Sequence, residues 1–270
     1  MILAIDLGAS KIRIAQISGT KVKNKKVIRN PGRKDRIKKN LFDLINQYPK
    51  QKICVSFAGV VIDGLTKGTL NMDFENVPLA KLLKQKFKTS VFIDNDANCA
   101  GLAELHYGVG KKYNNFVFLT LGTGIGGAII INKKLYRGNG SAGEVGSMHM
   151  GKNIYEYLAS GSAQTRIASA HGLGKISPKE LELQADKGNK KALDVFNTIG
   201  ENLGTGLANL AYLLDPDVFI FGGGFAKVKH FYPKTRENLK KLYPLNQNLK
   251  IIKAKFGDNA GLIGAALLAK

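Results

Sequence analysis

The stretch "LTLGTGIGGAIIINKKLY", residues 119–136, places four glycines between two apolar runs that are typical of β-strands. Gly122, Gly124, Gly126 and Gly127 leave this connection almost without side chains, so its backbone can approach another group closely. Backbone N–H groups in such a turn can hold a phosphate. An ordinary hairpin turn explains a single copy of the pattern equally well.

The same pattern occurs once earlier in the chain. The segment "ILAIDLGASKIRIAQISGTKV" aligns with "FVFLTLGTGIGGAIIINKKLY" at a constant offset of 114 residues, which superposes Gly8 on Gly122 and Ile17 on Ile131. Each copy reads as strand, glycine turn and strand. Two such turns facing each other across a cleft would present N–H groups to a polyphosphate from both sides.

Composition restricts the class of protein. The chain has 270 residues, 44% of them hydrophobic, which is enough for a substantial core. No long apolar run is present, and Asp6 interrupts the apolar start, so we expect no membrane span, no signal peptide and a cytoplasmic protein. Cys54 and Cys99 lie in apolar segments and read as core residues. The net charge of +21 is scattered over many short basic runs, which favours solvated faces over a nucleic-acid site.

Strands and helices alternate along the chain. Apolar alternation and β-branched runs predict strands at residues 1–8, 11–17, 26–30, 52–59, 90–96, 114–122, 126–132, 218–224 and 249–256. Helical spacing predicts helices at residues 36–48, 79–87, 97–108, 154–214 and 260–269, the long one broken near 172–178 and at 188. This order is that of an α/β protein.

The order of the motifs resembles that of a known superfamily. After the first turn come "FIDNDANCAGLAE", the second turn, "VFIFGGGFA" and "GLIGAALLA", the order found in the sugar kinase, Hsp70 and actin superfamily. The run "LTLGTGIGGAIIINKKLYRGNGSAGEVG" resembles the signature of the ROK family, and "TLNMDFENVPL" and "YLASG" match it as well. The resemblance implies two α/β domains of ribonuclease-H-like, actin-like ATPase type with an interdomain cleft. We expect a small domain of residues 1–112 plus 258–270 and a large domain of residues 113–257.

The resemblance also implies an activity. It indicates an ATP-dependent sugar kinase that needs Mg²⁺ and transfers the γ-phosphoryl group to a hexose, with glucose to glucose 6-phosphate as the leading reaction. Polyphosphate is an alternative donor, and the basic surface permits it. A ROK-type sugar sensor or repressor is the non-enzymatic alternative, but such proteins carry a DNA-binding segment before the first strand, where this sequence starts. We expect no specific nucleic-acid partner and no membrane partner, and a homodimer is an alternative to a monomer.

Donor binding is assigned to the glycine turns and to Asp6. Asp6, at the end of the first strand, would organise Mg²⁺ directly or through water, although a strand-end cap is an alternative role. Lys11 matches the family's Gly-Thr-Lys position but also fits a surface lysine, and Ala9 and Ser10 replace the usual Gly-Thr. The expected nucleotide-binding residues are Asp6, Gly8, Ser10, Lys11, Gly122, Thr123, Gly124, Gly222, Gly223 and Gly224.

Catalysis is assigned to Asp96, the Asp of the family's Asn-Asp pair. Its carboxylate, taken near its ordinary ionised state, would accept the proton of the attacking sugar hydroxyl. Asp96 or Asn98 could instead be the N-cap of the following helix, and Asp94 reads as a neighbour. By resemblance, the sugar is bound by Gly59, Asn71, Asn95, Asp96, Glu144, His149 and Glu156.

The sequence departs from the family after Glu144. Most members carry a His and then a four-ligand zinc loop, whereas Ser147 stands at the His position here and no cysteine follows. We therefore expect no structural zinc site. His149 could replace the missing His or could be an ordinary loop residue. Packing around Met148, Met150, Ile154 and Tyr155 would have to orient Glu144 and Glu156.

Overall fold

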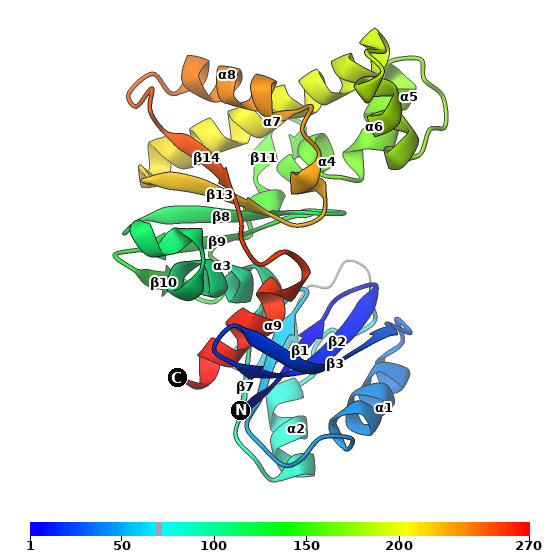
Figure 1. The fold of residues 1–270 in the computed structure, drawn as a ribbon, viewed down its shortest axis with the longest axis vertical. Helices are drawn as coiled ribbons and strands as arrows, with labels where there is room; N and C mark the ends of the chain where they lie inside the picture. Colours follow the sequence, from blue (N-terminus) through cyan, green and yellow to red (C-terminus); the bar gives the residue numbers. More distant parts are fainter. Residues whose placement is uncertain (68–71) are drawn as a thin grey trace.

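The chain is built from two sheets that lie one above the other with helices between them and on both outer faces (Figure 1). The computed structural model describes residues 1–67 and 72–270. Helices α1 (Lys34–Ile45) and α2 (Leu79–Phe87) cover the outer face of the first sheet, and α3 (Asp96–Tyr107) and α9 (Ala260–Ala265) lie between the sheets. The outer face of the second sheet is covered by α7 (Lys190–Leu214) and α8 (Tyr232–Leu242).

The two sheets share one topology. The first runs in the order β3-β2-β1-β4-β7, and the second runs β10-β9-β8-β13-β14. In each, a hairpin is followed by strands that pair in parallel. The first sheet consists of β1 (Ile2–Leu7), β2 (Lys11–Ser18), β3 (Lys21–Arg29), β4 (Ile53–Phe57) and β7 (Val91–Asn95). The second consists of β8 (Phe116–Leu121), β9 (Ile125–Ile131), β10 (Lys134–Tyr136), β13 (Val218–Gly222) and β14 (Lys250–Lys253). The internal repeat expected from the sequence is confirmed.

The constant offset between the copies fails after the glycine turn. In the first copy the last paired residues are Leu7 and Ile12, whereas in the second they are Leu121 and Ile125. The second turn is therefore one residue shorter, and β9 is shifted by one place relative to β2. The structural equivalent of Ile17 is Ile130, because both pair with the first residue of the neighbouring strand, and not Ile131.

Alternation along the strands sorts the core into layers. Leu3, Ile5 and Leu7 pack with α1 and α2, whereas Ala4 packs with Cys99 of α3 and with α9. The second sheet is divided in the same way. Leu119 and its same-face neighbours pack in the core with α7, whereas Phe118 packs with residues of α3. Both cysteines are buried and free, as expected.

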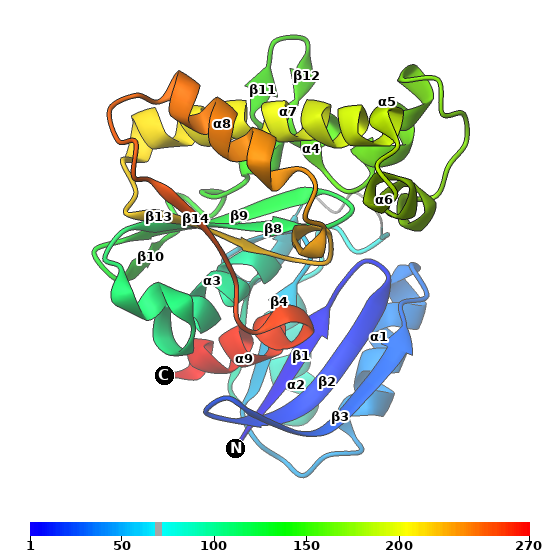
Figure 2. The same ribbon diagram turned by 45° about the horizontal axis from the view of Figure 1, so that its top comes forward.

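Small residues let α3 and α9 fit between the sheets. A Cβ on Gly264 would lie 1.6 Å from the carbonyl oxygen of Cys99, and one on Gly101 would lie 2.7 Å from the Cβ of Ala128. The glycine-rich and alanine-rich C-terminal segment therefore serves close helix packing, as its composition predicts. The N-terminus of α3 is thereby held at the junction of the two sheets (Figure 2).

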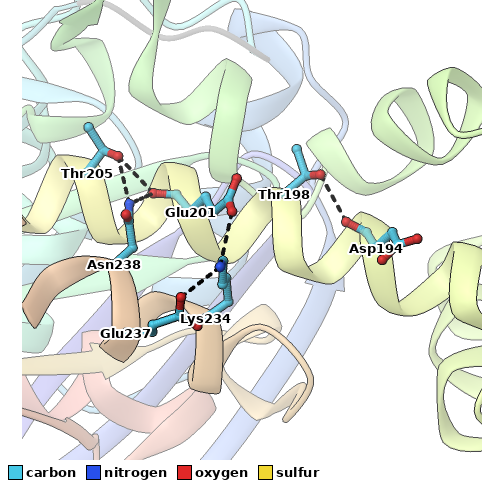
Figure 3. Close-up of polar contacts among 7 residues, drawn as sticks. All are labelled: Asp194, Thr198, Glu201, Thr205, Lys234, Glu237 and Asn238. Carbon is cyan, nitrogen blue, oxygen red and sulfur yellow. Dashed lines mark hydrogen bonds and ion pairs between the residues drawn. The ribbon is translucent and has the colours of Figure 1, made fainter. Parts of the chain in front are cut away.

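The region predicted as one broken helix contains several. The breaks near 172–178 and 188 are present, and a further break at Ser160 separates the first two helices. The helices are α4 (Tyr155–Ala159), α5 (Ala163–Ala170), α6 (Pro178–Asp186) and α7. Helix α8, which the sequence pattern did not predict, packs along α7. Its Lys234 pairs with Glu201 and Glu237, and its Asn238 donates to Thr205 and to the carbonyl of Glu201 (Figure 3).

Two short hairpins were also not expected from the sequence. One consists of β5 (Val60–Ile62) and β6 (Leu65–Lys67), and the other of β11 (His149–Met150) and β12 (Asn153–Ile154). In the described part of the chain, no helix combines the length and apolar character needed to cross a membrane. The domain boundaries at residues 112, 113, 257 and 258 stay a prediction.

Candidate functional site

A cavity lies at the junction of the two sheets. Strands of both sheets line it, as do the first turns of α3 and of the C-terminal segment. Its lining includes Asp6, Arg13, Asp96, Gly222, Gly223 and Gly261. Of the residues expected to bind a nucleotide, Asp6, Gly222 and Gly223 therefore meet in one place, and Asp96 joins them.

Asp6 is almost fully buried at the end of β1 and is held by two neighbours. Arg13 of β2 lies opposite in the strand register, and its Nη1 donates to Oδ2 of Asp6 at 2.7 Å. Ser56 of β4 donates to Oδ1 at 3.2 Å. Burial raises the pKa of Asp6, and the charge of Arg13 and the hydrogen bonds offset part of that rise. Asp6 thus belongs to an ion pair as well as to the strand end.

The cap of α3 is Asn95. Its side-chain oxygen accepts hydrogen bonds from the backbone N–H groups of Ala97 at 2.8 Å and Asn98 at 3.1 Å. The expectation that Asp96 or Asn98 could cap this helix is therefore wrong. Because Asn95 takes the capping role, the carboxylate of Asp96 in the first turn contacts only backbone N–H groups among the described residues, those of Ala97 and of Asp96 itself. Asp96 also lines the cavity.

Asp96 is in an acidic environment. Burial, and then the carboxylates of Asp6 and Glu144, raise its pKa to about 7, against the N–H of Ala97, which lowers it. The sequence-based expectation of an ordinary ionised Asp is therefore wrong. A carboxyl group with a pKa near neutrality can both accept and release a proton at physiological pH.

Asp94, two residues earlier, has hydrogen-bond donors on both of its carboxylate oxygens. It is buried, and its Oδ1 accepts from the N–H of Asn95 and from Nδ2 of Asn98, both at 2.8 Å. Its Oδ2 accepts from Nε and Nη2 of Arg137, both also at 2.8 Å. Because these donors occupy both oxygens, Asp94 orders the end of β7 and the loop after β10.

Four of the expected sugar-binding residues, Gly59, Asn95, Glu144 and Glu156, lie near Asp96. Nδ2 of Asn95 donates to the carbonyl of Gly59 at 3.1 Å and lies 3.5 Å from Oε1 of Glu144. Burial raises the pKa of Glu144, and the nearby carboxylate of Glu156 adds to the rise. Gly59 thus fixes Asn95 through its backbone, and Glu144 and Glu156 form a second acidic group next to Asp96.

The second glycine turn is shaped by the segment that carries Glu156. A Cβ on Gly124 would lie 2.4 Å from Oε2 of Glu156, which accepts the N–H of Ile125 at 3.2 Å. Gly161 donates to the carbonyl of Gly122 at 2.8 Å, and Ser162 donates its hydroxyl proton to the carbonyl of Thr123 at 2.7 Å. Gly122 has open space where a Cβ would stand. Gly124 is therefore explained by packing, whereas Gly122 keeps an open face.

The three glycines at the end of β13, Gly222 to Gly224, differ in whether the structure requires a glycine. Gly223 has φ of +86°, and its Cβ would lie 2.3 Å from the carbonyl oxygen of Leu121. Gly222 has ordinary φ but passes 2.6 Å from the ring of Phe118 at the Cβ position. Gly224 has neither constraint. Gly222 and Gly223 are therefore required because the chain passes close to β8 there, and these two glycines line the cavity.

The first glycine turn lies outside the lining of this cavity. Gly8 donates to the carbonyl of Lys11 at 3.0 Å, and Asn30 holds the turn by donating to the carbonyl of Gly8 and accepting with Oδ1 from Gly32. Ser10 and Lys11 are exposed. Their roles in phosphate binding stay predictions, like those of Gly122, Thr123 and Gly124.

One expected sugar-binding residue, His149, is not among these contacts. His149 is exposed, and its side chain makes no hydrogen bond or ion pair with the part of the chain that the structure describes. Its strand belongs to hairpin β11–β12, which lies on the side of the second sheet away from the first sheet (Figure 2). Asn71 lies outside the described residues. Tyr155 is buried in the α7 core, and Met148 and Met150 pack against that core, which supports the expected packing around the acidic residues.

The donor set suits a magnesium–phosphate complex. Within the described part of the chain, no three His, Cys, Asp or Glu side chains form a metal-binding group. Mg²⁺ keeps several water ligands and is usually held by one or two carboxylates together with substrate phosphates. The carboxylates of Asp6 and Asp96, which line one cavity, meet that requirement.

Arg13 and Arg137 are the site residues that sequence reasoning missed. Arg13 lies opposite Asp6 across a four-residue turn, so hairpin pairing of "DLGASKIR" contained the signal. Arg137 comes from the loop after β10, and no local pattern links it to Asp94.

Two repeated sheets, with an acidic cavity at their junction, define the two-domain actin-like ATPase fold, and both halves are ribonuclease-H-like. The chain belongs to the ROK family, whose profile matches residues 2–270.

The relatives include enzymes of known activity. The chain is 34% identical over 224 residues to the uncharacterized protein CPE0188 of Clostridium perfringens, covering 79% of this chain and 76% of that protein. It is 33% identical to a glucokinase of Streptomyces coelicolor over 74% of this chain and 73% of that enzyme. A ROK family glucokinase from Streptomyces griseus, solved with glucose and AMPPNP, superposes with a TM-score of 0.86 at 27% identity, covering 99% and 98% of the two chains.

Other relatives differ in function. They include an N-acetyl-D-glucosamine kinase of Pectobacterium carotovorum, at 28% identity over 99% of this chain, and a xylose repressor of Caldicellulosiruptor bescii, at 28% over 97%. The matched region is 98% of the kinase and 76% of the repressor. The family therefore contains several sugar specificities and a regulator.

Proposed function

We propose that this chain is an ATP-dependent hexose kinase that transfers the γ-phosphoryl group of ATP to glucose, giving glucose 6-phosphate. The observation that carries the proposal is the position of Asp96. It lies at the N-terminus of α3 in a cavity between the two sheets, with Asp6 and the glycines of β13 on the donor side and Asn95 and Glu144 beside it. The glucokinase relatives support the choice of glucose.

Asp96 would act as the general base. The attacking hydroxyl of the hexose gives its proton to the carboxylate of Asp96 as the oxygen–phosphorus bond forms, and the phosphoryl group leaves ADP. A positioned base of this kind contributes roughly 10²–10⁴-fold. The pKa of about 7 means that near neutral pH a large share of Asp96 is ionised and ready to accept the proton.

Asn95, Glu144 and Glu156 would hold the sugar. Carboxylates and an amide that lie close together can select a hydroxyl pattern, because the wrong epimer leaves one of these groups without a hydrogen-bond partner. Asp6 would hold Mg²⁺, which when bound neutralises charge on the donor phosphates. Gly222 and Gly223 would allow the nucleotide to pass close to the backbone.

A donor and acceptor screen tests this proposal. Purified protein is incubated with ATP or polyphosphate and with glucose, N-acetylglucosamine or N-acetylmannosamine, and the sugar phosphates are quantified. We expect ATP and glucose to give the highest kcat/KM. Transfer from polyphosphate but not from ATP would show that polyphosphate is the donor. Faster transfer to an acetylated sugar than to glucose would show that the acetylated sugar is the acceptor.

A sugar-responsive regulator is the second candidate, because a xylose repressor matches 97% of this chain. The regulator would bind a sugar without transferring phosphate. Binding to duplex DNA distinguishes the two, since contacts to a few phosphates weaken steeply as salt increases. We expect no complex at physiological salt. A sequence-specific complex that persists there, with no phosphorylated sugar, would favour the regulator.

A further inference from the structure

Arg13 places a cation inside the acidic cavity. Its side chain, 22% exposed, leaves β2 on the same face as Ala15 and Ile17, which is the face turned towards α9. It lines the cavity with Asp6, Asp96 and Asp258. Three carboxylates without a nearby cation would repel a polyanionic phosphate donor.

Most of the guanidinium is unused. An arginine has five N–H donors, and among the described residues Arg13 engages a protein acceptor only through Nη1, at Asp6. Nε and Nη2 therefore have hydrogen-bonding capacity to spare beside the cavity. A guanidinium is the side chain best suited to two parallel hydrogen bonds with phosphate oxygens.

A second cation lies nearby on the same hairpin. Lys25 of β3 donates from Nζ to Oδ1 of Asn259 at 2.6 Å, and Asn259 follows the cavity-lining Asp258. The positive charge of Lys25 also lowers the pKa of Asp6. The repeat contains no equivalent arrangement on the other side. Thr120 occupies the place of Asp6 in β8, and its partner in β9 is Gly126.

We propose that Arg13 binds the phosphate groups of the donor, keeping Nη1 on Asp6 while its remaining N–H groups contact phosphate oxygens. This inference rests on the proposed function and names a residue of its donor site. Asp6 fixes the direction of the guanidinium, so that little side-chain freedom is lost when the donor binds.

Binding titrations test this role without requiring turnover. AMPPNP, ADP and AMP are titrated by calorimetry into wild-type protein, Arg13→Met and Arg29→Met, with and without Mg²⁺. Arg29 is an exposed residue of β3 on the same hairpin, so its replacement makes the same change of charge outside the cavity. We expect Arg13→Met to weaken AMPPNP roughly ten- to hundredfold, the range for a hydrogen bond to a charged group, and AMP by less than about twofold. Arg29→Met should leave all three affinities unchanged.

A second background separates phosphate contact from positioning of Asp6. If Arg13 acts only by holding Asp6, its loss has no effect once Asp6 carries no charge. In Mg²⁺-free buffer, Arg13→Met should therefore still weaken AMPPNP when added to Asp6→Asn. The double variant leaves no buried unpaired charge, so it keeps the test interpretable if Arg13→Met alone unfolds. Equal affinities of Asp6→Asn and the double variant would overturn the proposal.

The titrations also separate the role of Arg13 from the identity of the donor. If wild-type protein binds no adenine nucleotide, ATP is the wrong donor, and tripolyphosphate replaces AMPPNP in the same titrations. Weaker binding of tripolyphosphate by Arg13→Met would support Arg13 with a different donor. Equal binding by both proteins, or none by either, would overturn the role of Arg13.

Discussion

The two copies of the strand–turn–strand unit have the same backbone pairing but different chemistry. At the end of β1, Asp6 faces Arg13, and both side chains line the cavity. At the matching place in β8, Thr120 faces Gly126, and the glycines of the turn are in close contact with the segment that carries Glu156. The difference indicates that the repeat supplies a scaffold twice, while only the first copy carries a charged pair at this place.

The largest expected effect is at Asp96. Asp96→Asn keeps the shape of the side chain but removes the proton acceptor, so kcat should fall roughly 10²–10⁴-fold. Hexose affinity should stay within about tenfold, because the base acts chiefly in the transition state. Steady-state kinetics and calorimetry measure the two quantities. A variant that retains most of kcat would remove Asp96 from this role.

Asp94 is the matched control for Asp96 and should affect stability instead. Asp94→Asn loses the ion pair with Arg137 and places an amide where a carboxylate accepted from Asn95 and Asn98. We expect the free energy of unfolding to fall by about 1–3 kcal/mol, the cost of leaving buried polar groups unpaired. Urea denaturation measures it. A larger loss of kcat than for Asp96→Asn would reverse the roles of the two residues.

Glu104 tests how the chain returns from the second sheet to the first. Its fully buried carboxylate accepts the N–H groups of Lys255 at 2.7 Å, Phe256 at 3.2 Å and Val109 at 3.0 Å. Glu104→Gln would oppose one N–H with an amide N–H, so stability should fall by about 1–3 kcal/mol. Calorimetric melting measures the change, with Glu201→Gln, an exposed residue, as control. Equal melting temperatures would show that this carboxylate is dispensable.

A further effect concerns the dependence of stability on pH. The pKa of Asp96 is about 7 in the folded protein and 3.8 ordinarily, so between these values the folded state binds more protons than the unfolded state. Its contribution to the free energy of unfolding therefore decreases as pH rises through this window and is fully unfavourable above pH 7. Asp96→Asn should be more stable than wild type at about pH 8, with the difference vanishing towards pH 4. A constant difference would contradict the raised pKa.

The smallest effect should follow zinc removal. The acidic residues Glu144 and Glu156 are connected by a short segment whose Tyr155 is buried and whose Met148 packs against the α7 core. A zinc-selective chelator, with Mg²⁺ resupplied, should leave the melting temperature and sugar phosphorylation unchanged if side-chain packing, and not a metal, holds this segment. Stoichiometric zinc that is lost together with activity would contradict this prediction.

Sequence periodicity was sufficient for most strands of the two sheets, for the repeat and for the position of Asp96 between a strand and a helix. It missed β10 and placed the third strand at residues 26–30, whereas β3 spans Lys21–Arg29. It missed the shorter second turn because Gly126 and Gly127 have no side chains, and strand register cannot be inferred where alternation is invisible. It missed α8 because "YPKTRENLKKL" has few apolar residues. The raised pKa of Asp96 depends first on its burial and then on Asp6 and Glu144, which are distant along the chain, so no local pattern could reveal it.

The pH dependence of kcat/KM tests the central claim, that Asp96 is the proton acceptor in an acidic cavity, most directly. This quantity reports ionisation in the free enzyme. With ATP and glucose, we expect a bend near pH 7, where Asp96 titrates, and a fall in kcat/KM of about tenfold for each pH unit below it. Asp94→Asn should keep the same bend. A profile that is flat from about pH 5 to 8 in the wild-type protein would contradict the account.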